Sequence, residues 1–283
     1  MEKNLGTLFI VATPLGNLED MSPRAVKTLE TVDLIACEDT RHSRRMLLHF
    51  GVGKPTTSYH EHNEEEKTPQ LIARLLEGQS IALISDAGTP LLSDPGYRLV
   101  KECRVHEIKV IPVPGPFAGA AATSVSGLPT DRILFVGFLP KRKGAQEKEL
   151  QALGTVNASL VFYLSPHQLS RTMETIAETL GNSRHAFLIR EMTKLFESSY
   201  QGTLRDLCER VASEEPKGEY TLVVEGRAPE ADTSVQVDAE AYVEGLVEFR
   251  RLSPKDAVRQ AASELGIPRR ELYNRVMAKK KRS

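Results

Sequence analysis

Short apolar runs alternate with amphipathic segments along the first part of the chain. Ser22-Pro23 begins one of these segments with an N-cap residue and a proline at the first helical position. Asn63, followed by three glutamates that complement the helix dipole, is expected to cap another helix. The apolar runs are typical of buried parallel strands and lie at 7–12, 33–37, 81–85 and 108–113. Strands that alternate with helices in this way predict an α/β domain with a parallel sheet over residues 1–117.

A second group of apolar runs predicts another α/β domain over residues 118–227. Its expected strands lie at 133–138, 159–164, 186–190 and 219–224. Gly119 and the three alanines after it predict a helix that packs closely against the sheet and starts at the cleft between the two domains. Residues 140–144, Pro-Lys-Arg-Lys-Gly, are expected to form a basic loop.

The pattern changes again after the second domain. Residues 228–238 are rich in Pro, Ala, Asp, Thr and Ser and are expected to form a linker. Three helices are predicted beyond it, at 239–251, 254–265 and 269–279, with Ser253 as the N-cap of the second. Their core-facing side chains are expected to be Ala257, Val258, Ala261, Ala262, Leu265, Leu272, Tyr273 and Val276. The Gly-containing turn between the last two helices favours a helix-turn-helix-like domain over residues 239–283, with a simple helical cap as the alternative.

Three of the expected parallel strands end in loops rich in glycine and proline, at 13–17, 85–96 and 114–119. Such loops can simply terminate strands. In a doubly wound sheet, however, the carboxyl ends of the strands meet where ligands bind. None of the loops has the spacing of a dinucleotide-binding or P-loop motif. We therefore expect a small polar ligand that is not held mainly through phosphates.

Charge is distributed unevenly along a chain whose net charge is only −1. Residues 245–283 carry eleven Lys/Arg and four Asp/Glu, whereas the rest of the chain carries 26 and 34. A basic tail on an acidic body indicates a polyanionic partner. The three cysteines form no CxxC pair, which argues against a zinc knuckle or a redox couple. No apolar run is long enough for a signal segment or a membrane span, so we expect a cytoplasmic protein that contacts no membrane.

The loop motifs ATPLGN, SDAGTPLLSDPG and PVPGPFAGAAA resemble the tetrapyrrole methylase superfamily. Five further segments resemble the ribosomal RNA small subunit methyltransferase I family within it: CEDTR, SYHEHNE, GLPTDR, GFLP and REMTK. The resemblance covers nearly the whole chain. It implies two α/β domains with S-adenosylmethionine in the cleft between them, and a homodimer. It also implies 2′-O-methylation of a cytidine ribose in the 16S rRNA of the small ribosomal subunit.

Residue by residue, the resemblance assigns cofactor contacts to the three loops and to the second domain. These contacts are Pro14, Leu15, Asp86, Thr89, Leu92, Phe117, Ala118, Leu164, Met192 and Thr221. The superfamily often has Gly-Asp-Pro where this chain has Gly88-Thr89-Pro90, so the charge of that contact is missing here. The third loop often carries a small serine where this chain has Phe117, so only a backbone contact is expected there.

A ribose hydroxyl attacks a methyl group efficiently only if a base takes its proton. Candidates for this base are, in falling order, Glu38, His60 and Asp39, with Arg41 beside them as a substrate clamp. A structural ion pair is the alternative for these charged residues. His60 and His62 have the spacing of metal ligands on a strand, but no further ligand cluster accompanies them and we expect no metal.

Exposed cations are the candidates for holding RNA phosphates. They are Arg44, Arg45, Lys141, Arg142, Lys143, Arg269, Arg270 and Arg275. Two other functions stay open at this point. A tetrapyrrole methyltransferase of a corrin or sirohaem pathway is disfavoured by the basic tail and the CEDTR and YHEHNE segments. A non-catalytic RNA-binding assembly protein is disfavoured by the intact cofactor loops.

Overall fold

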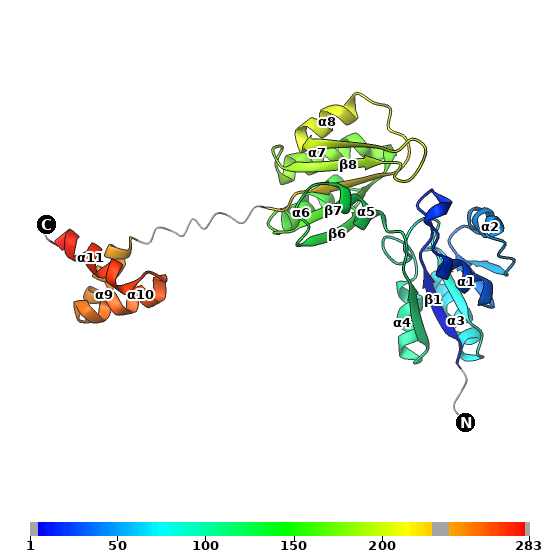
Figure 1. Cartoon of the computed structure of the whole chain (residues 1–283), viewed down its shortest axis with the longest axis horizontal. Coiled ribbons are helices and arrows are strands. Elements are labelled where there is room, and N and C mark those ends of the chain that lie inside the picture. The colour runs from blue at the N-terminus through cyan, green and yellow to red at the C-terminus, as the bar shows by residue number, and fades with distance from the viewer. Residues whose placement is uncertain (1–4, 228–237, 281–283) are drawn as a thin grey trace. The chain divides into compact units, whose positions relative to one another are not determined.

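The computed structural model describes residues 5–227 and 238–280 (Figure 1). The chain divides into two compact units, residues 1–227 and 228–283. Among the described residues, no helix is both long and apolar enough to cross a membrane.

The first sheet is wholly parallel, with the strand order β3-β2-β4-β1-β5. Its strands are β1 (Thr7–Val11), β2 (Leu34–Cys37), β3 (Thr56–Ser58), β4 (Ile81–Ile84) and β5 (Lys109–Val113). The associated helices are η1 (Leu18–Asp20), α1 (Pro23–Thr31), α2 (Thr40–His49), α3 (Glu64–Leu76) and α4 (Tyr97–Val105). The parallel sheet predicted over residues 1–117 is therefore present, with β3 as an unpredicted edge strand.

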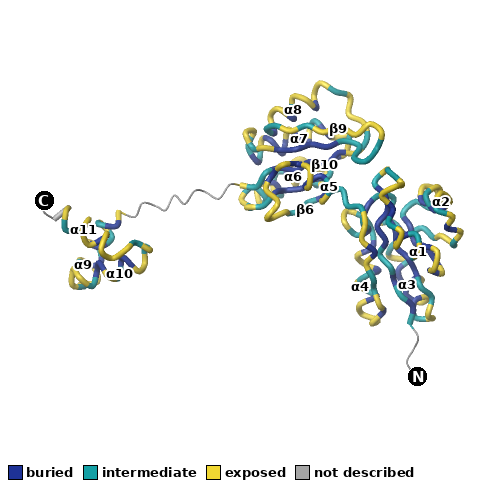
Figure 2. Tube along the Cα trace, in the orientation of Figure 1, coloured by how far each residue is buried: buried dark blue, intermediate teal, exposed yellow. Residues whose placement is uncertain are grey.

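Alternate residues of the central strands face opposite layers of helices, as the two-residue period of a strand requires. Ile81 and Leu83 of β4 pack with α3 and α4, whereas Ala82 and Ile84 pack with α1 and α2. Both faces of the sheet are thus covered, and Figure 2 shows the strands as the buried layer. The chain leaves β1 and β2 toward one face and β4 toward the other, so the connections diverge on both sides of β4, including the β1/β4 switch point.

The second sheet is mixed, with the order β6-β7-β10-β8-β9. Its strands are β6 (Ile133–Phe138), β7 (Ser159–Leu164), β8 (His185–Arg190), β9 (Ser198–Thr203) and β10 (Tyr220–Val224). Its helices are α5 (Ala118–Val125), α6 (Lys143–Leu153), η2 (Pro166–Gln168), α7 (Leu169–Leu180) and α8 (Leu204–Ala212). Only β6 and β7 are parallel; the other pairs are antiparallel. The four expected strands are present, β9 was not expected, and the division into domains at residue 117 stays a prediction.

Two local predictions for this first unit are confirmed only in part. Asn63 precedes α3 as expected, but its side chain makes no bond to a helix N–H. Instead its Oδ1 accepts from the His60 N–H at 2.9 Å and its Nδ2 donates to the Ser58 carbonyl. The basic loop at 140–144 is shorter than expected because α6 already begins at Lys143.

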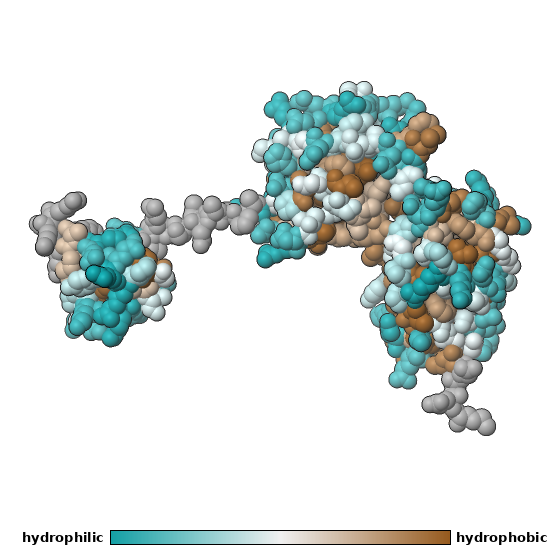
Figure 3. All heavy atoms as spheres, in the orientation of Figure 1, coloured by the Kyte–Doolittle hydropathy of each residue, from teal (hydrophilic) through white to brown (hydrophobic). Residues whose placement is uncertain are grey.

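The second unit consists of α9 (Ala239–Arg250), α10 (Pro254–Leu265) and α11 (Arg269–Lys280) around one apolar cluster. The Ser253 hydroxyl caps α10 by accepting from the Asp256 N–H, as predicted. Leu272 is buried in the cluster, but Tyr273 is 44% exposed, so its predicted inward position is wrong. The face of this unit drawn in Figure 3 is largely hydrophilic. Of the predicted linker, only Asp238 lies within the described residues, as the N-cap of α9.

Candidate active site

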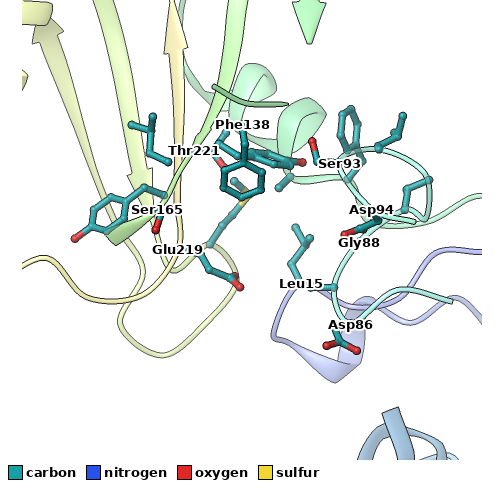
Figure 4. A pocket seen from close by; sticks show the side chains of 18 of the residues that line it. Leu15, Asp86, Gly88, Ser93, Asp94, Phe138, Ser165, Glu219 and Thr221 are labelled. Atoms are coloured by element: carbon teal, nitrogen blue, oxygen red, sulfur yellow. The ribbon is translucent and has the colours of Figure 1, made fainter. Parts of the chain in front are cut away.

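A cavity of about 380 Å³ lies between the two sheets of the first unit (Figure 4). Loops that follow β1, β4 and β5, with Glu38 after β2, form one wall, and residues from β6, β7, β10 and the end of β8 contribute to the other. The first wall includes the β1/β4 switch point, where a doubly wound sheet is expected to bind a ligand.

Backbone and hydroxyl groups join the three loops of the first wall. Thr13 and Gly88 exchange two backbone hydrogen bonds of 2.8 and 3.0 Å, and the buried Thr13 hydroxyl donates to the Ser85 carbonyl at 3.0 Å. The Thr89 hydroxyl donates to the Pro116 carbonyl at 2.9 Å and so ties the β4 loop to the β5 loop. Gly88 has a φ of +90°, which a residue with a Cβ rarely adopts. These contacts tie the three loops to one another.

Most of the predicted cofactor contacts border this cavity. Nine of them are lining residues: Leu15, Asp86, Thr89, Leu92, Phe117, Ala118, Leu164, Met192 and Thr221. Pro14 is buried in the same loop but is not among the lining residues. The cavity thus brings together residues from loops more than 100 positions apart in the chain, while their roles toward a ligand stay predictions.

Sequence reasoning missed several lining residues. Ser93 and Asp94 belong to the SDAGTPLLSDPG motif, so the same loop that predicted Asp86, Thr89 and Leu92 could have predicted them as lining residues. Phe138 and Tyr163 form an aromatic wall, with their ring centroids 5.5 Å apart, and Glu219 lies beside them on the second-sheet side. Phe138 belongs to the GFLP segment, whereas no local motif marks Tyr163 or Glu219.

The lining of the cavity is acidic. It contains four carboxylates, Glu38, Asp86, Asp94 and Glu219, and no Lys, Arg or His side chain among the described residues. Glu219 is paired with Lys194 at 3.0 Å. The other three form no ion pair within 4 Å in the described part of the chain. Such a lining attracts a cationic ligand and repels phosphate.

Burial, together with the crowding of these carboxylates, raises two pKa values. Burial, followed by the charges of Glu38 and Asp86, raises the pKa of Asp94 to about 7. Burial and the charge of Asp86 also raise the pKa of Glu38, while nearby His60 lowers it. Asp94 therefore exchanges its proton near neutral pH, as an efficient acid–base group does.

The other predicted catalytic residues lie outside the lining. Asp39 caps α2 by accepting from the N–H groups of Arg41, at 2.8 Å, and His42, and these bonds lower the pKa of its carboxyl. Arg41 is 92% exposed and lies 3.7 Å from Asp39. His60 is half-buried, with Nε2 3.1 Å from the amide of Asn63 and a buried Nδ1 that has no partner in the structure. Glu38 is the only one of the four that borders the cavity.

No group of three or more His, Cys, Asp or Glu side chains among the described residues is arranged to hold a metal ion. The His60 and His62 rings have centroids 6.1 Å apart.

The predicted RNA-binding cations differ in whether they already pair with carboxylates of the chain. Arg44, Arg45, Lys141, Arg142, Arg269 and Arg270 are exposed. Lys143 lies in α6 and pairs with Glu147 and Glu178 at 3.7 and 3.6 Å. Arg275 makes two bonds to Glu240, of 2.7 and 3.2 Å, and so holds α11 against α9. For these last two residues a structural role competes with RNA binding.

Comparison with known proteins gives one consistent result. Residues 7–208 match the family model of Tetrapyrrole (Corrin/Porphyrin) Methylases, and residues 237–280 match the RsmI C-terminal HTH domain. The chain is similar to two curated proteins named Ribosomal RNA small subunit methyltransferase I. One, from Mesorhizobium japonicum, is 46% identical over 95% of this chain and 91% of that protein. The other, from Xylella fastidiosa, is 44% identical over 95% of this chain and 98% of that protein.

Among solved structures, a diphthine synthase superposes with a TM-score of 0.63 over 79% of this chain and 91% of that chain. The two are 17% identical, so the likeness concerns the fold alone.

Proposed function

Because the chain belongs to the tetrapyrrole methylase family and, within it, to the ribosomal RNA small subunit methyltransferase I proteins, we propose that it 2′-O-methylates a cytidine ribose of 16S rRNA in the small ribosomal subunit. The methyl donor is S-adenosylmethionine. The names of the relatives support ribosomal RNA as the acceptor. Ribose, cytidine, a homodimeric assembly and a cytoplasmic location are our extensions of that premise.

The cavity fits this cofactor in size and charge. About 380 Å³ suffices for a compact small-molecule site, and aromatic and aliphatic side chains form much of the lining. When bound, S-adenosylmethionine supplies a methyl group that its positively charged sulfonium makes electrophilic. The unpaired carboxylates of Glu38, Asp86 and Asp94 favour a cationic ligand, and this acidic lining is the observation that carries the proposal.

Within this site the chain's own residues position the ribose and remove its proton. The first wall, joined by the Thr13–Gly88 and Thr89–Pro116 bonds, is proposed to supply alignment, which is the main requirement of an in-line displacement. Glu38 and Asp94 are the proposed proton acceptors because both border the cavity and both have raised pKa values. His60 lowers the pKa of Glu38 and is proposed to influence the reaction through that carboxyl rather than by contact with the substrate.

RNA is proposed to dock on cations outside the cavity. Exposed arginines of α2, Arg41, Arg44 and Arg45, follow Glu38 in the chain and suit phosphate contacts. Lys141 and Arg142 are exposed next to Phe138, which lines the cavity. The basic second unit supplies a further set of cations.

The test is transfer of a tritium-labelled methyl group from S-adenosylmethionine to small ribosomal subunits from cells that lack this gene, followed by nuclease mapping. We expect label in one 2′-O-methylated cytidine. The same assay is applied to Asp94→Asn, which removes a proposed proton acceptor. Its matched control is Asp131→Asn, which changes an exposed acid outside the lining. Binding of S-adenosylmethionine without transfer to any RNA would refute the proposed acceptor. Label on a base rather than a ribose would refute the 2′-O assignment.

A further inference from the structure

A groove of about 700 Å³ opens on the second unit, away from its apolar cluster. It lies between the first turns of α10 and α11. Its lining consists of Ser253, Pro254, Lys255, Arg269, Arg270, Tyr273 and Met277. Three of these side chains are cationic and none is acidic, which distinguishes the groove from the acidic cavity of the first unit.

Tyr273 contributes an exposed aromatic ring to the groove. Leu272, its neighbour in α11, fills the helical core and is fully buried, so the next position along the helix turns toward solvent. Arg269 and Arg270 precede Tyr273 by four and three residues, and this spacing places all three side chains on one face of α11. The ring is therefore flanked by two guanidinium groups.

The cations of the groove are available to a ligand. Lys255, Arg269 and Arg270 form no ion pair within 4 Å in the described part of the chain, whereas Arg275 is held by Glu240 and Arg259 by Asp256. Asp256 is the acid that Lys255 and Arg269 influence, and its oxygens already contact Ser253 and Arg259. A positive charge thus remains around the ring of Tyr273.

We propose that this groove binds an unpaired segment of the RNA substrate, with one base stacked on Tyr273 and phosphates on Lys255, Arg269 and Arg270. A free aromatic face among cations is the arrangement that binds single strands, because a stacked base has to leave its duplex. The inference rests on the proposed function for the identity of the RNA. It adds where and in what form that RNA is held.

The test measures binding of the full-length protein to a fluorescent single-stranded RNA of about 12 nucleotides and to the corresponding duplex. Tyr273→Ala is expected to weaken single-strand binding about 5- to 100-fold, with a much smaller effect on the duplex. Tyr273→Phe keeps the ring and is expected to retain the affinity. Phe249→Ala removes an aromatic side chain of the same unit that is 85% exposed and outside the groove, and serves as the matched control.

The phosphate contacts have a separate readout. Replacing Arg269 and Arg270 together by Gln should reduce the slope of log K against log salt by about 1.4 for a single strand. Arg259→Gln, in which the arginine outside the groove is paired with Asp256, should leave the slope unchanged.

Three outcomes overturn the inference. In the first, Tyr273→Ala has the same single-strand affinity as Phe249→Ala. In the second, Tyr273→Ala loses single-strand and duplex binding equally. In the third outcome the variant keeps its RNA affinity but no longer binds small subunits, which would assign the groove to a ribosomal protein. Wild-type methyl transfer is measured beside each variant. If wild-type methyl transfer is normal and Tyr273→Ala keeps its single-strand affinity, only the groove proposal is refuted. If wild-type methyl transfer is absent, the proposed function is refuted, whatever the oligonucleotide affinities are.

Discussion

Replacing Asp94 by Asn should stabilise the protein at alkaline pH while abolishing one of its proposed proton acceptors. The carboxyl of Asp94 lies in a partly buried cluster with Glu38 and Asp86, so its ionised form is disfavoured in the folded state. An amide of nearly the same shape carries no such charge. The gain should therefore depend on pH in a way that follows from the raised pKa.

The sign and size of the effect come from the shift itself. The pKa of Asp94 is about 7 in the folded chain against an ordinary value of 3.8, so folding takes up a proton between these two pH values. The stability that this proton uptake provides is complete below about pH 3.8 and lost as pH rises through 7. At about 1.36 kcal/mol per pKa unit, the full shift sets an upper limit of roughly 4 kcal/mol. Partial exposure and solvent screening reduce this to about 1–2 kcal/mol.

Urea unfolding at pH 5, 6, 7 and 8, followed by circular dichroism, measures this difference. Relative to wild type, Asp94→Asn should gain about 1–2 kcal/mol in free energy of unfolding at pH 8 and progressively less toward pH 5. Asp131→Asn, at an exposed acid outside the cavity, is the control and should follow wild type at every pH. A gain that is equal at pH 5 and pH 8 would refute the reasoning. So would a loss at pH 8, because it would mean that the ionised carboxylate makes favourable contacts in the folded state.

Three further predictions concern the methyl-transfer rate, cofactor binding and RNA binding. Glu38→Gln should lower the methyl-transfer rate by about 10²–10⁴ with little change in cofactor affinity by calorimetry, and full activity would remove Glu38 as a proton acceptor. Gly137→Ala should weaken cofactor binding, because φ is +75° there and the added methyl group collides with Ser93 of the cavity lining; an unchanged affinity would contradict this. Deleting residues 239–283 should weaken binding to small subunits and flatten its salt dependence but leave cofactor affinity intact, and unchanged RNA affinity would favour the helical-cap interpretation.

Much of the fold could be predicted because apolar patterning decides which strands are central. β4 reads Ile-Ala-Leu-Ile and is buried on both faces, so its sequence alone marks it as a strand. The unpredicted strands are β3, Thr-Thr-Ser, and β9, Ser-Ser-Tyr-Gln-Gly-Thr, which lie at sheet edges. Their strand conformation comes from hydrogen bonds to one neighbour, a tertiary effect that no local pattern records. The predicted inward position of Tyr273 was wrong for a related reason. A short helix has room for few core positions, and Leu272 occupies the buried one here.

The candidate site was predictable on one side only. In a parallel sheet all strands end at the same edge, so loops after β1, β4 and β5 had to converge, and glycine and proline marked them. The second sheet is mostly antiparallel, and its strand ends alternate between edges. Tyr163 and Glu219 therefore reach the cavity from positions that no motif singles out, and the GFLP segment does not by itself show that Phe138 lines it. Asp94 was within the recognised motif, but its raised pKa depends on burial and then on the nearby charge of Glu38, which the tertiary fold creates.

The near-zero net charge of the chain results from an acidic body, which contains the cavity, and a basic tail that offset each other. Glu38, Asp86 and Asp94 make the cavity attractive to a cationic cofactor, and the same charges repel a phosphate backbone. A polyanionic substrate consequently gains nothing from the cavity itself and has to be held by cations elsewhere on the chain. Under the proposed function, exposed arginines on α2 and the basic second unit would meet that requirement without neutralising the acids proposed to take part in the chemistry. Separate charge regions, rather than one mixed surface, allow a single chain to bind a cation and a polyanion at once.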